Sequence, residues 1–320
     1  MSLNRLPPEI HDILCLHLPS SHLAALSLSC SHFYNIVQRH LYRDIHITPA
    51  FHNLAVVPTL AAKPALARHV RSFSISLASQ SSVLLAYYRQ LARALSHMTG
   101  LSSLSLFVDP SASWVLRGVQ AKWLAAFACS FPFDSHVAAF LKTTPALLRL
   151  EVDPESQAYF NPEDASIIPH LEQFRGSSQV AQAIVPGRPV HSVFITSGEL
   201  TDVVAHLADS VSNVSILEAT ISSSPAPLLH LISERLPHVT HLRITYNSSE
   251  APDTAFYEDV GSALDAFPRL QTFEFSGMHW GSLKNNEISS EQNSSELQQT
   301  DAPSFETIDV DIDSEFFTDY

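Results

Sequence analysis

The sequence has little cysteine and little glycine, and it lacks any long apolar run. Only three cysteines occur in 320 residues, at Cys15, Cys30 and Cys129. That number cannot build a disulfide framework and is typical of a reducing compartment. No apolar run approaches the roughly 18 residues that span a membrane, and no basic segment leads into an apolar one as in a signal peptide. These absences predict a cytoplasmic or nuclear protein without membrane attachment.

Motifs for catalysis and metal binding are also absent. Eight glycines leave little room for loops that cradle phosphates, and no P-loop, GxGxxG or GxSxG sequence occurs. Cys15-x-His17 and Cys30-x-His32 contain the residue types that bind zinc. Two residues apart on a helix point to nearly opposite sides, so neither pair can converge on one ion. We therefore expect no metal, no cofactor, no catalytic residue and no enzymatic activity.

The net charge of −14 is unevenly distributed along the chain. Residues 1–120 hold 9 Lys and Arg against 4 Asp and Glu, a balance of +5. Residues 121–320 hold 9 against 28, a balance of −19. An acidic surface repels a phosphate backbone, so we expect no nucleic-acid partner.

The stretch of residues 6–44 predicts three short helices: LPPEIHDILCLHLPSSHLAALSLSCSHFYNIVQRHLYRD. A proline pair opens the first helix, where a missing N–H is tolerated. Ile10, Ile13, Leu14 and Leu18 follow at helical spacing and form one apolar stripe. Helices this short are marginal alone and must pack on each other or on a partner.

This stretch resembles an F-box. The matching residues are Leu6-Pro7-x-Glu9-Ile10, Ile13, Leu18, Leu23, Leu26 and Phe33. The resemblance is confined to this small part of the chain and implies docking onto the Skp-type adaptor of a cullin–RING ubiquitin ligase. The adaptor-binding residues that it implies are Leu6, Pro7, Pro8, Ile10, Ile13, Leu14, Leu23 and Leu26.

An apolar pattern of the form apolar-x-x-apolar-x-apolar recurs after the helices. It is seen at Val70-Phe73-Ile75, Leu101-Leu104-Leu106, Leu147-Leu150-Val152, Leu171-Phe174, Val190-Val193-Ile195, Val214-Leu217-Ala219, Val239-Leu242-Ile244, Leu270-Phe273-Phe275 and Phe305-Ile308-Val310. The last two apolar positions alternate as in a strand. Helical stretches lie between these strands, at about 83–98, 200–211, 228–236 and 255–267. A short strand–helix unit that recurs along the chain indicates a repeat architecture.

The repeated units resemble leucine-rich repeats. The resemblance covers residues 68–312 and implies a solenoid in which parallel strands line the inside and helices the outside. The expected fold is therefore α/β, with an N-terminal three-helix F-box followed by a leucine-rich-repeat solenoid. An F-box followed by such repeats is similar to the substrate receptors that occur in large sets in mushroom-forming (basidiomycete) fungi.

Residues between the core positions of a strand point away from the core. This alternation predicts a substrate-binding side for a protein of unknown identity. It comprises Arg149, Glu151, Asp153, Arg175, Phe194, Glu218, Arg243 and Glu274, followed by Asp309 and Asp311.

The longest interval between strand starts separates Leu101 from Leu147. We expect one or two helices in it, at about 119–130 and 135–142. The interval is rich in aromatic residues, which pack a core more often than they bind a partner. These residues are Trp114, Trp123, Phe127, Phe131, Phe133 and Phe140.

The sequence divides into five predicted segments. They are an F-box at 1–47, a connecting segment at 48–67, the repeats at 68–283, a disordered polar loop at 284–304, and a last strand with an acidic tail at 305–320. The combination of an F-box-like segment with leucine-rich-repeat-like units predicts the substrate-receptor subunit of a Skp–cullin–F-box ubiquitin ligase. Two alternatives remain: a non-catalytic repeat scaffold outside any ligase, and a hydrolase-like α/β enzyme, which strict strand–helix repetition disfavours.

Overall fold

The structure is a computed structural model, and Met1–Trp280 forms one compact unit. It describes residues 7–48, 53–77, 84–155, 167–222, 224–246 and 254–281. The predicted polar loop at 284–304 and the predicted strand at 305–310 lie outside this described part, as do Leu6, Asp309 and Asp311.

Three short helices open the chain: α1 (Pro8–Leu16), α2 (Ser20–Ser29) and α3 (Ser31–Leu41). They correspond to the three helices that the sequence predicts. Their buried side chains form a small core that is separate from the core of the remaining chain. The residues of this core are Cys15, Leu23, Phe33, Ile36 and Val37. We refer to α1–α3 as the N-terminal bundle.

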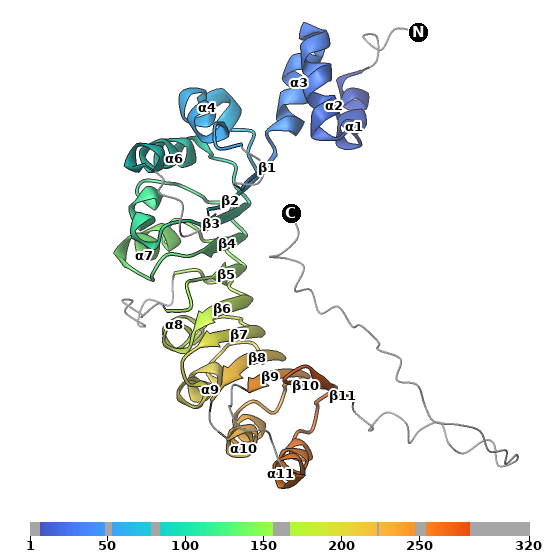
Figure 1. Cartoon of the computed structure of the whole chain (residues 1–320), viewed down its shortest axis with the longest axis vertical. Coiled ribbons are helices and arrows are strands. Elements are labelled where there is room, and N and C mark those ends of the chain that lie inside the picture. Colours follow the sequence, from blue (N-terminus) through green and yellow to red (C-terminus); the bar gives the residue numbers. More distant parts are fainter. Residues whose placement is uncertain are drawn as a thin grey trace, which may run out of the picture. The chain divides into compact units, whose positions relative to one another are not determined.

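A parallel sheet follows, in which each strand pairs with its neighbours in the sequence (Figure 1). The pairing is parallel throughout the ten strands β1 to β10. These strands are β1 (Asp44–Ile47), β2 (Ser72–Ser76), β3 (Ser103–Phe107), β4 (Ala126–Cys129), β5 (Arg149–Glu151), β6 (Gln173–Ser177), β7 (Ser192–Ser197), β8 (Ile216–Ile221), β9 (His241–Tyr246) and β10 (Thr272–Phe275). The α/β class and the parallel strands are thus as predicted, in an arrangement compatible with a solenoid.

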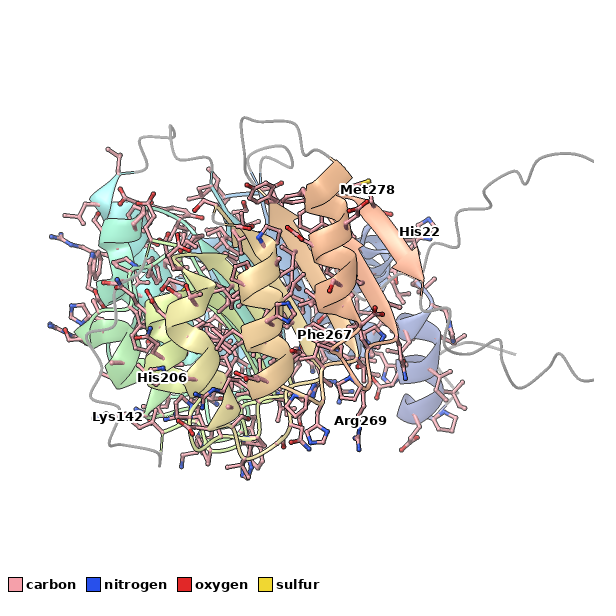
Figure 2. All side chains as sticks on the ribbon, turned by 90° about the horizontal axis from the view of Figure 1, so that it is seen from below. His22, Lys142, His206, Phe267, Arg269 and Met278 are labelled. Carbon is pink, nitrogen blue, oxygen red and sulfur yellow. The ribbon has the colours of Figure 1, made fainter. Side chains whose placement is uncertain are left out.

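Helices cover one face of this sheet (Figure 1). They are α4 (Val56–Ala62), α5 (Pro64–Ala67), α6 (Leu85–His97), the 3-10 helix η3 (Pro110–Leu116), α7 (Ser135–Leu141), α8 (Ser178–Ile184), α9 (Leu200–Ala208), α10 (Pro225–Arg235) and α11 (Thr254–Leu264). The yellow to orange helices α9 to α11 lie side by side in Figure 2. Within the described residues, no helix is long and apolar enough to cross a membrane.

The core lies between these helices and the sheet. In β2, for example, Phe73 and Ile75 are fully buried, whereas Ser72 and Ser74 are half-buried and Ser76 is exposed. The same alternation recurs along most of the other strands, and the inward residues of the strands join those of the helices in one continuous cluster. The opposite face carries no helix in the described part of the chain, and we call it the open face.

Strand β4 corrects the prediction of a helix at 119–130. Its sequence, Ala126-Phe-Ala-Cys129, is buried at all four positions. Because the outward residues are alanines, the strand shows no alternation between apolar and polar residues. In the sheet register, Phe127 stands between Leu104 and Leu150 and exactly midway between them in sequence. The long interval is therefore two repeats of equal length.

The second helix predicted in this interval is confirmed as α7. The aromatic residues mostly pack the core, as expected: Phe127, Phe131, Phe133 and Phe140 are buried. Trp123 is the exception, with 72% of its surface exposed.

The segment predicted as a connection at 48–67 contains two helices instead. In α4 and α5, Val57, Leu60 and Leu66 are buried in the core of the sheet. Strand β1 already pairs with β2. The parallel sheet therefore begins at Asp44, before the predicted start of the repeats at residue 68.

Strand β11 (Met278–Gly281) follows β10 after only two residues, Ser276 and Gly277. Both have positive φ, 47° and 85°, as in the tight turn that joins antiparallel strands. A parallel connection would need a much longer crossover. The chain therefore reverses at this point, and β11, which begins at the labelled Met278 in Figure 2, lies at the edge of the sheet.

Candidate interaction surfaces

Helix α1 packs into the bundle through its less apolar side. His11 and Cys15 are almost fully buried, and the His11 ring lies edge-on to Phe33 at 4.8 Å between centroids. The larger aliphatic residues of α1 face outward: Ile10, Ile13 and Leu14 are 41%, 52% and 43% exposed. Spaced at i, i+3 and i+4, they share one side of the helix.

A charged cluster holds α1 against α3. Asp12 Oδ1 of α1 lies 3.2 Å from Arg39 Nη2 and 2.9 Å from His40 Nε2 of α3. Each exposed ion pair contributes little alone. With the buried His11 and Cys15, however, the cluster fixes which side of α1 faces the bundle. The exposed aliphatic side is therefore a stable feature of the surface.

The structure separates the predicted adaptor-binding residues into two groups. Ile10, Ile13 and Leu14 are accessible. Leu23 is 5% exposed in the bundle core, whereas Leu26 packs against that core and remains partly exposed. Pro7 is exposed and precedes α1; nothing is described of Leu6 or of the Pro8 side chain. We call Ile10, Ile13 and Leu14 the α1 apolar face.

Leu28 of α2 is an exposed residue that the sequence analysis missed. It is 88% exposed. Since it lies two residues after the inward Leu26, it points to the opposite side of the helix. That spacing was available in the sequence.

The open face of the sheet gathers most of the predicted substrate-binding residues. The parallel register aligns six of them on consecutive strands from β5 to β10. In strand order they are Glu151, Arg175, Phe194, Glu218, Arg243 and Glu274. We call this line the charged row. Arg149 lies in the neighbouring row, opposite Gln173. Asp153 lies after β5, where its carboxylate accepts a hydrogen bond from the Glu155 N–H.

The charged row is ordered by its own contacts. Arg243 Nε lies 2.7 Å from Glu274 Oε2, and Arg243 Nη1 lies 3.8 Å from Glu218 Oε2. The hydrogen bond with Glu274 raises the pKa of Arg243. The Arg175 guanidinium lies 4.7 Å from the centre of the Phe194 ring, a cation–π geometry. These contacts fix the positions of several side chains on the open face.

Among the described residues of the charged row, Glu151 is the one whose carboxylate lacks a hydrogen-bond partner for a buried oxygen. Its Oε2 atom is buried and has no hydrogen-bond partner in the described part of the chain. Burial raises the pKa of this carboxyl group, while the positive charge of Arg175 lowers it by a smaller amount. An unpaired, partly buried carboxylate is costly, so this position favours either a proton or a donor from a partner.

We expect the substitution Glu151→Gln to stabilise the protein at neutral pH. A carboxyl group whose pKa is raised by folding binds its proton more tightly in the folded state, so its ionisation opposes folding. This penalty is absent below the ordinary glutamate pKa of about 4.3 and is complete once the pH exceeds the raised pKa. Melting temperatures should therefore favour the variant at about pH 7 and converge near pH 4. Glu218→Gln, which removes a carboxylate paired with Arg243, is the matched control and should give no such gain.

Toward β1, the charged row is continued by residues that are not acidic or basic like most of those from β5 to β10. It continues with small or neutral side chains: Ala128 of β4, Ser105 of β3, Ser74 of β2 and His46 of β1. The serines alternate with buried apolar residues in β2 and β3. That alternation is visible in the sequence, although the predicted substrate-binding residues include none before Arg149.

The structure offers no preformed metal centre within the described residues. No group of three or more His, Cys, Asp or Glu side chains there could hold an ion. Burial raises the pKa of Cys129 to about 12, so its thiol stays protonated at neutral pH.

No protein-family model matches the chain, and no curated protein matches it.

Proposed function

We propose that this chain is the non-catalytic substrate receptor of a Skp–cullin–F-box ubiquitin ligase. The N-terminal bundle acts as the F-box and binds the Skp-type adaptor. The strand–helix repeats act as leucine-rich repeats and hold a protein substrate. The receptor would accelerate ubiquitin transfer by raising the concentration of substrate near the ubiquitin-loaded enzyme.

The observation that carries this proposal is the orientation of α1. A helix in a three-helix bundle normally turns its largest apolar residues inward. In α1, His11 and Cys15 occupy the inside, while Ile10, Ile13 and Leu14 remain exposed. Exposed apolar residues grouped on one side of an element favour a protein partner. The resemblance of residues 6–44 to an F-box supports the adaptor as that partner.

The open face supports the receptor half of the proposal. The charged row alternates acidic and basic residues with one aromatic ring, across six strands. A row with both signs of charge suits recognition of a protein surface, because complementary charges select a partner and reject others.

The test is direct binding of the purified full chain to a Skp-type adaptor, measured by calorimetry. We expect a one-to-one complex with the wild type. Ile13→Asp places a charge in the α1 apolar face and should weaken binding by about thirtyfold or more, since a buried anchor contributes roughly 2 kcal/mol. Circular dichroism checks that the variant remains folded.

Leu85→Asp is the matched control. Leu85 is a 56%-exposed leucine in the first turn of α6, where an acid is tolerated, and its replacement should leave adaptor binding unchanged. Failure of the folded wild type to bind the adaptor would overturn the proposal and leave a repeat scaffold. Equal binding by the wild type and Ile13→Asp would overturn the assignment of the docking face.

A further inference from the structure

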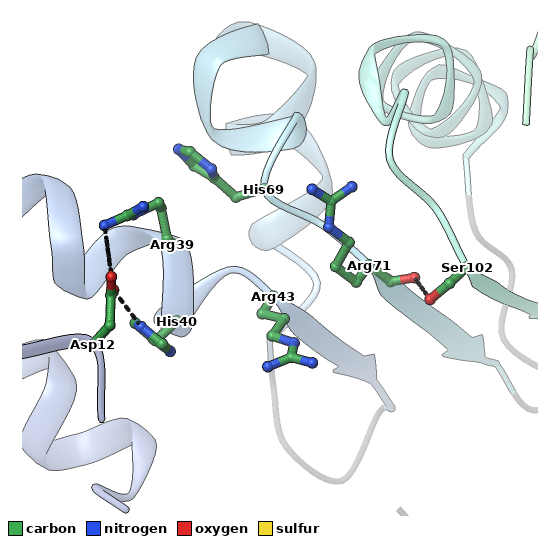
Figure 3. Close-up of a pocket in the computed structure, with 7 residues that line it drawn as sticks. All are labelled: Asp12, Arg39, His40, Arg43, His69, Arg71 and Ser102. Atoms are coloured by element: carbon green, nitrogen blue, oxygen red, sulfur yellow. Dashed lines mark hydrogen bonds and ion pairs between the residues drawn. The ribbon is translucent and has the colours of Figure 1, made fainter. Parts of the chain in front are cut away.

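A cavity of about 370 Å³ lies where α1 and α3 meet the starts of the first strands (Figure 3). Its lining residues come from several elements that are distant in sequence. They are Asp12, Arg39, His40, Arg43, His69, Arg71 and Ser102. The volume is in the range of small-molecule sites. Three arginines and two histidines line it against a single carboxylate.

The strand register places the backbones of two of these arginines on neighbouring strands, from which their side chains extend in opposite directions in Figure 3. Because Asp44 pairs with Ser72 and Ser72 with Ser103, Arg43, Arg71 and Ser102 occupy equivalent positions just before β1, β2 and β3. Adjacent strands are about 4.8 Å apart. The Arg43 carbonyl accepts the Arg71 N–H at 2.8 Å, and the Arg71 carbonyl accepts the Ser102 N–H at 2.8 Å. The sheet thus fixes the backbone on which both guanidinium groups stand.

The side chain of Arg71 is held in place by one contact and keeps other donors available. Arg71 Nη1 donates to the carbonyl of Gly100 at 2.8 Å. A Cβ atom at Gly100 would lie 1.6 Å from that nitrogen, so only glycine permits this approach. A guanidinium has five N–H donors. Among the described residues, no hydrogen bond or ion pair occupies Arg71 Nη2, nor either terminal nitrogen of Arg43.

The charge of the cavity is incompletely balanced. Asp12 is already shared between Arg39 and His40, and the Asp44 carboxylate lies 3.8 Å from Arg43 Nε. Burial lowers the pKa of the His69 imidazole, and the positive charges of Arg39 and Arg71 lower it further. The cavity therefore has a net positive charge, although the chain as a whole has a net charge of −14.

We propose that this cavity binds a phosphate group. Planar guanidinium groups match phosphate oxygens with two parallel hydrogen bonds, and the three arginines outnumber the two nearby carboxylates, Asp12 and Asp44. The Ser102 hydroxyl already donates its proton to the Arg71 carbonyl at 3.0 Å, so the arginines supply the donors of this site. The phosphate could belong to a small molecule or to a phosphorylated side chain, and the chemistry of the site is the same for both. The inference does not depend on adaptor binding, because it concerns the isolated chain.

The test uses calorimetric titration of the full chain with inorganic pyrophosphate and, separately, with an acetylated Ala-phosphoserine-Ala peptide and its unphosphorylated form. We expect saturable one-to-one binding of at least one phosphate probe. Binding of pyrophosphate alone indicates a small-molecule source, and binding of the phosphopeptide but not its unphosphorylated form indicates a protein source. Arg43→Gln and Arg71→Gln should each weaken binding roughly tenfold or more, as expected for a charged hydrogen bond.

Arg89→Gln is the matched control, since it removes the same charge from an exposed position on α6 and should leave the affinity unchanged. Arg43 is the safer variant for folding because its only ion pair among the described residues is the 3.8 Å contact with Asp44. The proposal is overturned if folded wild type binds neither phosphate probe, or if Arg43→Gln and Arg89→Gln bind with the same affinity as wild type.

Discussion

Replacing Arg188 with methionine is expected to lower the free energy of unfolding by about 3–5 kcal/mol. Arg188 is 1% exposed. Its Nε donates to the Ile167 carbonyl at 2.9 Å, and its Nη1 donates to the carbonyls of Ile184 and Pro186. Methionine fills similar volume but donates nothing, so these buried carbonyls would lose their partner. Equilibrium denaturation with urea, followed by circular dichroism, measures the change.

The position of Arg188 explains why the effect should be large. The residue follows α8 in a turn, with Gly187 at φ 71°, and its side chain reaches back to the carbonyl of Ile184, the last residue of that helix. The contact with Ile167 ties the same turn to the segment before β6. Arg188 therefore replaces the hydrogen bonds that a helix end normally obtains from a cap or from water.

Arg269→Met is the matched control for this prediction. Arg269, labelled in Figure 2, is exposed after α11, and its replacement should change stability by no more than about 0.5 kcal/mol. Equal stability of the two variants would show that the carbonyls around Arg188 find other partners.

Truncating Phe127 to alanine should cost about 3–5 kcal/mol. The ring is fully buried in β4 and lies 5.0 Å from that of Phe140 in α7, centroid to centroid. Its removal leaves a cavity between strand and helix, because closely packed neighbours relax only partly. Urea denaturation measures the shift in midpoint.

Trp123→Ala is the control, and it tests the role of the aromatic interval directly. Trp123 is a larger aromatic only four residues away, but it is 72% exposed, so its loss should change stability by no more than about 0.5 kcal/mol. A large effect at Trp123 with a small one at Phe127 would contradict the placement of β4 in the sheet.

The repeat pattern of the sequence predicts the strands that alternate clearly. All eight strand motifs that fall within the described residues correspond to strands, β2, β3 and β5 to β10. Strand β4 was not predicted because Ala126 and Ala128 occupy its outward positions, so the sequence shows no alternation between apolar and polar residues. Helix α8 was not predicted because it is only seven residues long, too short for Gln179 and Gln182, its two residues that are not buried, to establish a helical period.

The candidate surfaces were predicted less completely than the strands. For α1, the apolar spacing of Ile10, Ile13 and Leu14 identifies one side of a helix, but not whether that side faces inward. The answer depends on His11 and Cys15, whose burial arises from contacts with α3. On the open face, strand alternation identifies Glu218, Arg243 and Glu274 as outward residues. Their mutual ion pairs depend on register, which repeats of unequal length do not reveal.

The order of the strands has a consequence for how the chain reaches its fold. Each pairing from β1 to β10 joins strands that follow one another in the sequence. The register partners closest in sequence are Phe174 and Val193, and even the most distant, such as Phe73 and Leu104, are joined by a single short crossover. The entropy lost in closing such loops depends weakly on their length, so every step of assembly costs nearly the same. From β1 to β10, no strand needs a segment beyond its sequence neighbours in order to pair. Growth can begin at any neighbouring pair of strands and spread both ways, even while the chain is still emerging from the ribosome.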